Sequence, residues 1–177
     1  MNSSASTESN VHTPACAAQA ELVERIARFT PGDGVHLTPV RQLMLIRISS
    51  PTECTPTVYE PRLALVAQGS KVATLAGETY RYDPLNYLVV SVTLPMIGQV
   101  IEATPEKPYL SLRLDIDPDE IAELLIDAGQ PHADNGVDLG LYAARVNAPL
   151  MDAVLRLMRL LDAVSYTHLT LPTILLV

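Results

Sequence analysis

The fold is decided by residues 62–82, which read RLALVAQGSKVATLAGETYRY. Three short runs in this stretch are rich in the aliphatic, β-branched and aromatic residues that favour strands. Gly69–Ser70 and Gly77–Glu78 separate the runs, and glycine at these places supplies the positive φ that a tight hairpin needs. Two successive hairpins predict three antiparallel strands, over 62–68, 71–76 and 78–82.

The strand pattern continues on both sides of this stretch. Runs rich in Val, Leu, Ile and Tyr predict further strands over 43–48, 87–92, 97–102 and 109–115. Turns between strands are predicted at Asp83–Pro84, Leu94–Pro95 and Thr104–Pro105. We therefore expect an antiparallel β meander or barrel over about residues 35–115.

The last predicted strand alternates strictly between two kinds of residue. Its two faces carry Leu110, Leu112 and Leu114 on one side, and Tyr109, Ser111, Arg113 and Asp115 on the other. We expect the leucine face to pack in the core, and the opposite face either to be exposed to solvent or to line a pocket.

Helices are predicted before and after the strands. Apolar residues at three- and four-residue intervals predict an amphipathic helix over 17–29. Asp117–Pro118, followed by two acids, predicts a helix that begins there and ends at Gly129. After an irregular stretch over 130–148, a last helix begins near Pro149 and carries a wide apolar face, which packs on the barrel or also pairs with a second copy.

Length and composition indicate one folded domain. The 177 residues are 48% hydrophobic and 18% charged, which is ordinary for a globular protein. We assign residues 1–16 to a disordered lead-in and 17–162 to the domain. The net charge of -8 argues against direct DNA binding by this chain. Without a membrane span or an apolar leader, a cytoplasmic location is expected.

Residues suited to catalysis or metal binding are scattered. The four histidines, at 12, 36, 132 and 168, lie far apart in the sequence, whereas a metal-dependent cupin needs them to converge from neighbouring strands. Cys16, in the lead-in, and Cys54, in a loop, are interpreted as free thiols. The sequence contains no GxSxG nucleophile elbow and no phosphate-binding glycine loop. We predict no catalytic residue, no metal and no cofactor.

An ordered series of segments forms a longer signature. The segments are Tyr59–Pro61, Leu65–Lys71, Tyr80–Asp83, Tyr87–Val92, Leu94–Pro95, Glu102–Leu110 and Leu112–Asp115. In order and spacing they resemble the N-terminal domain of AraC-type bacterial transcription regulators, over about residues 31–162. The resemblance implies a cupin-like antiparallel half-barrel of jelly-roll type, mainly β with α, with an N-terminal helix and C-terminal helices. It also implies an effector-sensing and dimerisation domain that controls a C-terminal pair of helix-turn-helix units.

The end of the sequence departs from that resemblance. Two DNA-reading units would need on the order of 100 further residues, so we expect a fragment truncated before them. Ser165–Thr173 resembles translated sequencing-adapter read-through, and its Thr and Pro residues interrupt the helical period after Val164. Residues 163–177 are therefore expected to be a non-native tail.

The expected effector site is the barrel interior, because small-ligand sites are mostly apolar cavities with a few placed polar groups. The candidate residues are Arg47, Tyr59, Glu60, Gln68, Gln99, Tyr109 and Arg113. Arg113 is favoured, since its guanidinium could hold a carboxylate or phosphate bidentately. The partners expected are an unknown small-molecule effector and a second copy of the chain, bound through Leu150, Val154, Leu157 and Leu161.

Two alternatives stay open at the level of sequence. One is a small metal-dependent cupin enzyme, an isomerase or a dioxygenase. The other is a dimerisation module with a filled core and no ligand.

Overall fold

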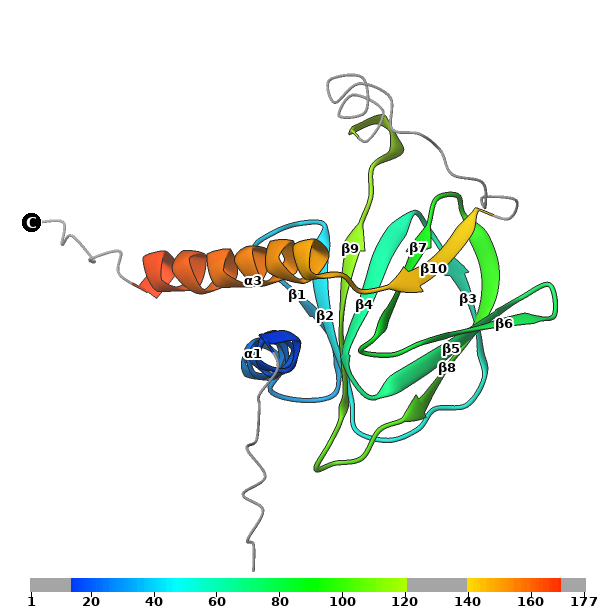
Figure 1. The fold of residues 1–177 in the computed structure, drawn as a ribbon, viewed down its shortest axis with the longest axis horizontal. Helices are drawn as coiled ribbons and strands as arrows, with labels where there is room; N and C mark the ends of the chain where they lie inside the picture. Colours follow the sequence, from blue (N-terminus) through cyan, green and yellow to red (C-terminus); the bar gives the residue numbers. More distant parts are fainter. Residues whose placement is uncertain (1–13, 121–139, 170–177) are drawn as a thin grey trace, which may run out of the picture.

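The computed structural model describes residues 14–120 and 140–169, with side chains over 15–120 and 140–163. Two antiparallel sheets face each other, and both helices lie on the outer side of the larger sheet (Figure 1). The helices are α1 (Pro14–Phe29) and α3 (Ala148–Leu169). The strands are β1 (Gly34–Leu37), β2 (Leu43–Ile48), β3 (Thr55–Tyr59), β4 (Arg62–Gln68), β5 (Ser70–Leu75), β6 (Glu78–Tyr82), β7 (Asn86–Val90), β8 (Leu94–Glu102), β9 (Tyr109–Asp115) and β10 (Leu141–Arg145).

The larger sheet has six strands in the order β1-β2-β9-β4-β7-β10, and the smaller has four in the order β3-β8-β5-β6. The expectation of a mainly β, open half-barrel with flanking helices is confirmed. The described residues contain no helix with the length and apolar character needed to cross a membrane.

Two hydrophobic cores result from this layering. One lies between the six-stranded sheet and the helices, where Leu22 and Ile26 of α1 meet Met158 of α3 and Leu112 of β9. The other lies between the two sheets. The central strands of the six-stranded sheet, β2, β9, β4 and β7, therefore pack against a core on each face. In β9 the leucine face meets the helices, whereas Tyr109 on the opposite face, only 2% exposed, lies inside the sandwich.

The strands β2, β4, β6 and β9 have the predicted bounds, and β5, β7 and β8 differ from prediction only at their ends. Sequence reasoning missed β1, β3 and β10, and the assignment of residues 141–145 to an irregular stretch was wrong. All three missed strands lie at sheet edges, where one side of the strand is unpaired. An edge strand buries less surface and so carries a weaker apolar pattern.

The predicted hairpin at Gly69–Ser70 is wrong. Strand β4 belongs to the six-stranded sheet and β5 to the four-stranded sheet, so Gly69 is the point where the chain passes from one to the other. The hairpin at Gly77 is confirmed, because Leu75 pairs with Glu78 across a two-residue turn. Ala76 and Gly77 both have positive φ, 51° and 88°, as a type I′ turn requires.

The predicted turn at Leu94–Pro95 is also wrong, because both residues belong to β8. Pro95 pairs with Val58 of β3, while β5 pairs with β8 only from Ile97 onward. Proline lacks a backbone N–H, and it is tolerated where only one side of a strand is paired.

The helix boundaries differ from prediction at both ends of the chain. Helix α1 begins at Pro14, so Cys16 lies in it and not in a lead-in. Helix α3 continues to Leu169, because Thr167 lowers helix propensity by only a fraction of a kcal/mol. Asp117 caps a helix as predicted, since its Oδ1 accepts from the backbone N–H of Asp119 at 3.0 Å. The rest of that predicted helix, 121–129, lies outside the described residues.

Candidate functional site

Charged and phenolic side chains gather between the two sheets. Strands β4 and β9 pair so that Arg62 lies opposite Asp115 and Ala64 opposite Arg113. Side chains alternate along a strand, so the two arginines and the carboxylate share the face that looks toward the four-stranded sheet. We name this group the inner polar cluster, and it consists of Tyr59, Arg62, Tyr82, Tyr109, Ser111, Arg113 and Asp115.

Within the cluster, Arg113 forms an ion pair with Asp115. Its Nη2 donates to Asp115 Oδ2 at 3.2 Å and contacts Met44 Sδ at 2.8 Å. Its Nε lies 2.9 Å from Asp115 Oδ1, but these two buried atoms are not aligned for a hydrogen bond. The pair therefore gains charge attraction without a fully formed bidentate bond.

Arg62 is the most buried cation of the cluster, at 7% exposed. Its Nε donates to the backbone oxygen of Glu60 at 2.8 Å, and its guanidinium lies 5.0 Å from the centre of the Tyr59 ring. Lys71 Nζ lies 5.5 Å from the same ring centre. Burial, and next the positive charge of Arg113, lower the pKa of Arg62, whereas the charge of Asp115 opposes this.

Three tyrosines, Tyr59, Tyr82 and Tyr109, are buried between the two sheets beside the arginines. The hydroxyls of Tyr59 and Tyr82 lie 3.4 Å apart, and both side chains are buried. Burial raises the pKa of Tyr82 and of Tyr109 above that of an exposed phenol. A hydrogen bond with Ser111 acts in the opposite direction on the pKa of Tyr109. The rings of Tyr82 and Tyr109 are therefore held as neutral phenols beside the cations.

The structure brings three of the seven predicted ligand residues together, namely Tyr59, Tyr109 and Arg113. Glu60 is exposed beside them, and its backbone oxygen accepts from Arg62. The remaining three bind backbone oxygens elsewhere: Arg47 that of Thr30 at 3.3 Å, Gln68 that of Pro108 at 2.8 Å, and Gln99 that of Thr52 at 3.0 Å.

Sequence reasoning missed Arg62, Tyr82 and Lys71. The period-two alternation of β4 runs from Val66 through Ala64 to Arg62 and could have placed Arg62 on the inner face. No comparable signal marks Tyr82 and Lys71, because their position depends on how the two sheets face each other. Of the four histidines, His36 lies in β1, and its Nε2 is 2.8 Å from the backbone oxygen of Gly32. Among the described residues, no three His, Cys, Asp or Glu side chains form a group suited to a metal.

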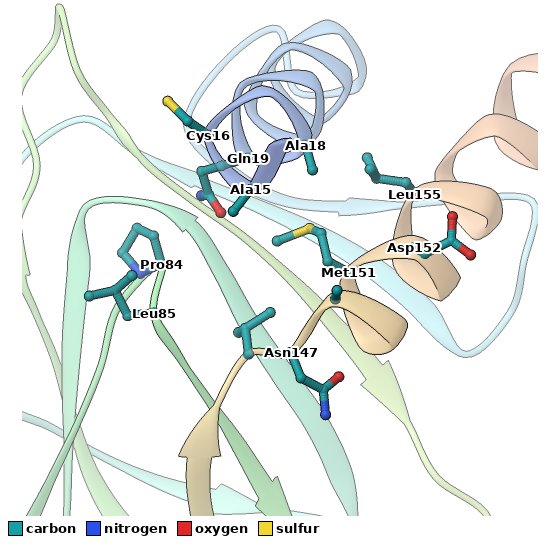
Figure 2. Close-up of a pocket in the computed structure, with 12 residues that line it drawn as sticks. Ala15, Cys16, Ala18, Gln19, Pro84, Leu85, Asn147, Met151, Asp152 and Leu155 are labelled. Atoms are coloured by element: carbon teal, nitrogen blue, oxygen red, sulfur yellow. The ribbon is translucent and has the colours of Figure 1, made fainter. Parts of the chain in front are cut away.

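A groove of about 560 Å³ lies outside the sandwich, between α1, α3 and the loop after β6. Figure 2 shows Ala15 and Gln19 of α1 across from Pro84 and Leu85, with Met151 of α3 directed into the space between the helices. Two of its polar side chains are engaged with backbone, since Gln19 donates to Ala67 O, and Asn147 Oδ1 accepts from Leu150 N at 2.9 Å. A second groove, of about 610 Å³, shares Gln19 and Pro84 and is also lined by Gln68.

The four residues predicted for dimerisation pack against their own chain. Val154 and Leu161 are buried, at 5% and 0% exposed, in the core formed with α1 and the six-stranded sheet. Leu150 and Leu157 are partly buried against the same core. Among the side chains of α3 that the structure describes, 148–163, the exposed large hydrophobic one is Leu160, at 60%.

Comparison with known proteins gives one family. The family described as AraC-type transcriptional regulator N-terminus matches residues 39–175, a range that includes most of the expected tail. Among solved structures, the crystal structure of apo ToxT K231A from Vibrio cholerae strain SCE256 is similar, with a TM-score of 0.46 and 5% identity. The match covers 67% of this chain and 47% of that one, so this chain spans about half of its length. No curated protein matches.

Proposed function

This chain belongs to the family of AraC-type transcriptional regulator N-termini, and from that premise we propose that it senses a small-molecule effector inside the β sandwich. It is the regulatory part of such a regulator and not an enzyme. DNA contacts would belong to another part of the regulator, in keeping with the net charge of -8 of this chain. We also propose a cytoplasmic location, as transcription control requires.

The observation that carries the proposal is the inner polar cluster. Filled cores are apolar, and burying a charge such as that of Arg62 costs free energy unless a partner compensates it. A sandwich that served only as a scaffold would have no need of two arginines on its inner face. An effector that contacts them would supply the missing compensation.

The strand that carries Arg62 is connected to α3 through neighbouring paired strands of the six-stranded sheet. Strand β10 pairs with β7, which in turn pairs with β4, the strand of Arg62. Two residues after β10 the chain enters α3, which packs against α1. Ligand binding at one end of the sheet would shift α3 only if the ligand binds one arrangement more tightly than the other.

The test is a fusion of the whole chain to a heterologous helix-turn-helix domain, with promoter output measured across a library of small molecules. Sensing predicts that at least one compound changes the output, and that Arg113→Ala abolishes this response while the protein level stays unchanged. Unchanged output across a broad library would contradict sensing. Stoichiometric iron, manganese or zinc in the purified protein would instead support the cupin-enzyme alternative, which the family does not favour.

We further propose that two copies associate through α3. Val154 and Leu161 are almost fully buried in their own chain. The interface would therefore use Leu150 and Leu157, which are partly buried, together with the exposed Leu160. A plain dimerisation module without a ligand differs from this proposal in one respect, because it predicts association that no effector alters.

A further inference from the structure

We propose that the groove of about 560 Å³ between α1, α3 and the loop after β6 binds a small molecule that is uncharged and largely apolar. We name it the helix groove. Its lining comes from the two helices, from the β6–β7 loop and from the segment between β10 and α3, so the site lies outside the sandwich (Figure 2). The inference goes beyond the proposed function and does not depend on an effector inside the sandwich.

The first argument is the size and the surface of the helix groove. Its volume lies within the range of small-ligand sites, roughly 300–1,000 Å³. Leu85 lines it with 60% of its surface exposed, and the buried residues Met151 and Leu155 of α3 line it as well. An apolar molecule would remove exposed apolar surface from water, and the flexible side chain of Met151 can adapt to its shape.

The second argument is that the polar groups of the lining have partners within the chain. Gln19 donates to a backbone oxygen of β4. Asn147 occupies two N–H groups at the start of α3, because its Oδ1 accepts from Leu150 N at 2.9 Å and its backbone oxygen accepts from Met151 N at 3.0 Å. Pro149, just before them, has no N–H. The start of α3 is therefore already capped, and it offers little to an anion.

The third argument is charge. Among the described lining residues Asp152 alone is charged, and its carboxylate lies 3.4 Å from Arg156 Nε in the same helix. Asp152 keeps 63% of its side chain exposed, so water screens that carboxylate. It would repel an anion, and a cation would have to compete with Arg156 for it. A charged ligand would thus lose hydration without gaining an unpaired partner, whereas an uncharged ligand has little hydration to lose.

The fourth argument is the place of the groove in the fold. Val146 N donates to Leu85 O at 2.8 Å, which ties the segment before α3 to the loop after β6. Both residues line the groove, together with Ala15 of α1 and Met151 of α3. A bound molecule would contact all of these elements at once, so it should hold the start of α3 against α1 and the sandwich. Because it would bind only the folded chain, it should also raise the thermal stability.

The test uses the full chain with three probes of similar shape: naphthylmethanol, which is neutral, naphthoate, which is anionic, and naphthylmethylammonium, which is cationic. Calorimetry measures their binding, and thermal shift measures the stabilisation that they cause. We expect naphthylmethanol to bind and to raise the unfolding temperature. The two charged probes should bind at least about tenfold more weakly, because the lining offers no unpaired charge to compensate their lost hydration.

A pair of variants on α1 locates the bound probe. Ala15→Phe places an aromatic ring in the groove and should weaken naphthylmethanol binding by at least about tenfold. The matched control is Ala17→Phe, because Ala17 is also exposed on α1 but does not line the groove. Both variants replace an exposed alanine of the same helix, so a difference between their affinities reports on the groove.

The two cysteines report on the site in the unaltered chain. Both thiols are free and exposed, but Cys16 lines the helix groove, whereas Cys54 lies just before β3 of the four-stranded sheet. Saturating naphthylmethanol should slow the reaction of Cys16 with N-ethylmaleimide and leave that of Cys54 unchanged, as followed by peptide mass spectrometry. This measurement needs no variant, so it decides the matter even if Ala15→Phe fails to fold.

No binding of naphthylmethanol, or equal binding of a charged probe, would overturn the proposal. Equal affinities of Ala15→Phe and Ala17→Phe for the probe, or no protection of Cys16, would place the probe elsewhere and would also overturn it. If Cys16 is protected at high protein concentration without any probe, a second copy covers the groove and the small-molecule site fails. These readouts do not use promoter output, so the proposed sensing function can fail while the helix groove stands.

Discussion

At the scale of single residues, Gly69 is the position at which the chain passes from the six-stranded sheet to the four-stranded sheet. Its φ is +77°, and a Cβ built there would lie 2.4 Å from the backbone oxygen of Glu102 and 3.1 Å from Tyr109 Cα. Both neighbours are backbone atoms held in strands, so they cannot move aside cheaply. The chain can therefore cross between the sheets at this point only with glycine.

Replacing Gly69 with alanine should therefore destabilise the protein by more than the backbone strain alone, which is about 1–2 kcal/mol for a left-handed residue. The matched variant is Gly77→Ala, at φ +88° with open space around the position, which carries the strain without the clash. Urea unfolding of the two variants measures the difference. Equal losses of unfolding free energy in the two variants would mean that the backbone around residue 69 moves to accept the new Cβ without cost.

The buried phenols predict a loss of stability in alkali. Burial raises the pKa of Tyr82 and Tyr109 in the folded chain above the 10.0 of an exposed tyrosine. The unfolded chain therefore releases these protons first. The stability that they contribute is fully present below about pH 10 and falls above it, by up to about 1.4 kcal/mol per pH unit for each tyrosine.

Unfolding free energies measured between pH 8 and pH 11 check this expectation. Tyr109→Phe should show a shallower alkaline loss than the parent, because one of the two phenols is gone. Its stability near pH 8 should be lower by about 1 kcal/mol, since the hydrogen bond with Ser111 is lost. Parallel curves for parent and variant above pH 10 would contradict the burial of this hydroxyl.

At the scale of elements, α1 and α3 are joined by charges as well as by their apolar faces. The carboxylate of Asp162 in α3 contacts both Arg25 and Arg28 of α1. In the other direction, Arg159 Nη2 lies 2.9 Å from Glu21 Oε2. These crossed pairs hold the two helices in register, and α3 is the element through which the proposed signal would leave the sheet.

Asp162→Asn should loosen this contact. Asp162 is partly buried and serves two arginines, so we expect a loss of about 1 kcal/mol in unfolding free energy, which shrinks at high salt. Asp152→Asn is the control, because Asp152 forms an exposed pair with Arg156 within one helix, at 3.4 Å. Equal effects of the two substitutions in thermal unfolding would show that the helix–helix pairs add nothing.

At the scale of the whole molecule, the arrangement of two cores predicts where a second copy can bind. The inner side of α3 is occupied by the protein's own core, so a second copy would meet the opposite side of the helix, which carries the exposed Leu160. Leu160→Glu should weaken self-association by at least about tenfold, because a charge enters an apolar contact. Val58→Glu is the matched control, since Val58 is equally exposed, at 60%, but lies on β3.

Sedimentation equilibrium of the parent and both variants measures this effect. A monomeric parent at all concentrations would contradict association of this chain through α3. Weakening by Val58→Glu and not by Leu160→Glu would move the interface to the four-stranded sheet.

The sequence by itself determined the local part of this structure. Strands β2, β4, β6 and β9 and the hairpin at Gly77 follow from alternation and turn residues a few positions apart, which is the distance over which propensity acts. The ordered segments from Tyr59 to Asp115 resemble those of the family as a long series, and the match of the family over residues 39–175 confirms that resemblance. Of the candidate site, Tyr59, Tyr109 and Arg113 could be predicted, because polar residues on strands with an apolar face stand out.

Only the tertiary structure decided which strands share a sheet. The glycine at 69 has the same positive φ as that at 77, yet one crosses between sheets and the other turns within a hairpin. Arg62 looks like an ordinary strand-end arginine, and it becomes a buried charge because β3 places Tyr59 over it. Pairing depends on the free energy of contacts between distant segments. A period read along the chain indicates which face a side chain occupies, but not which strand or ring will cover it.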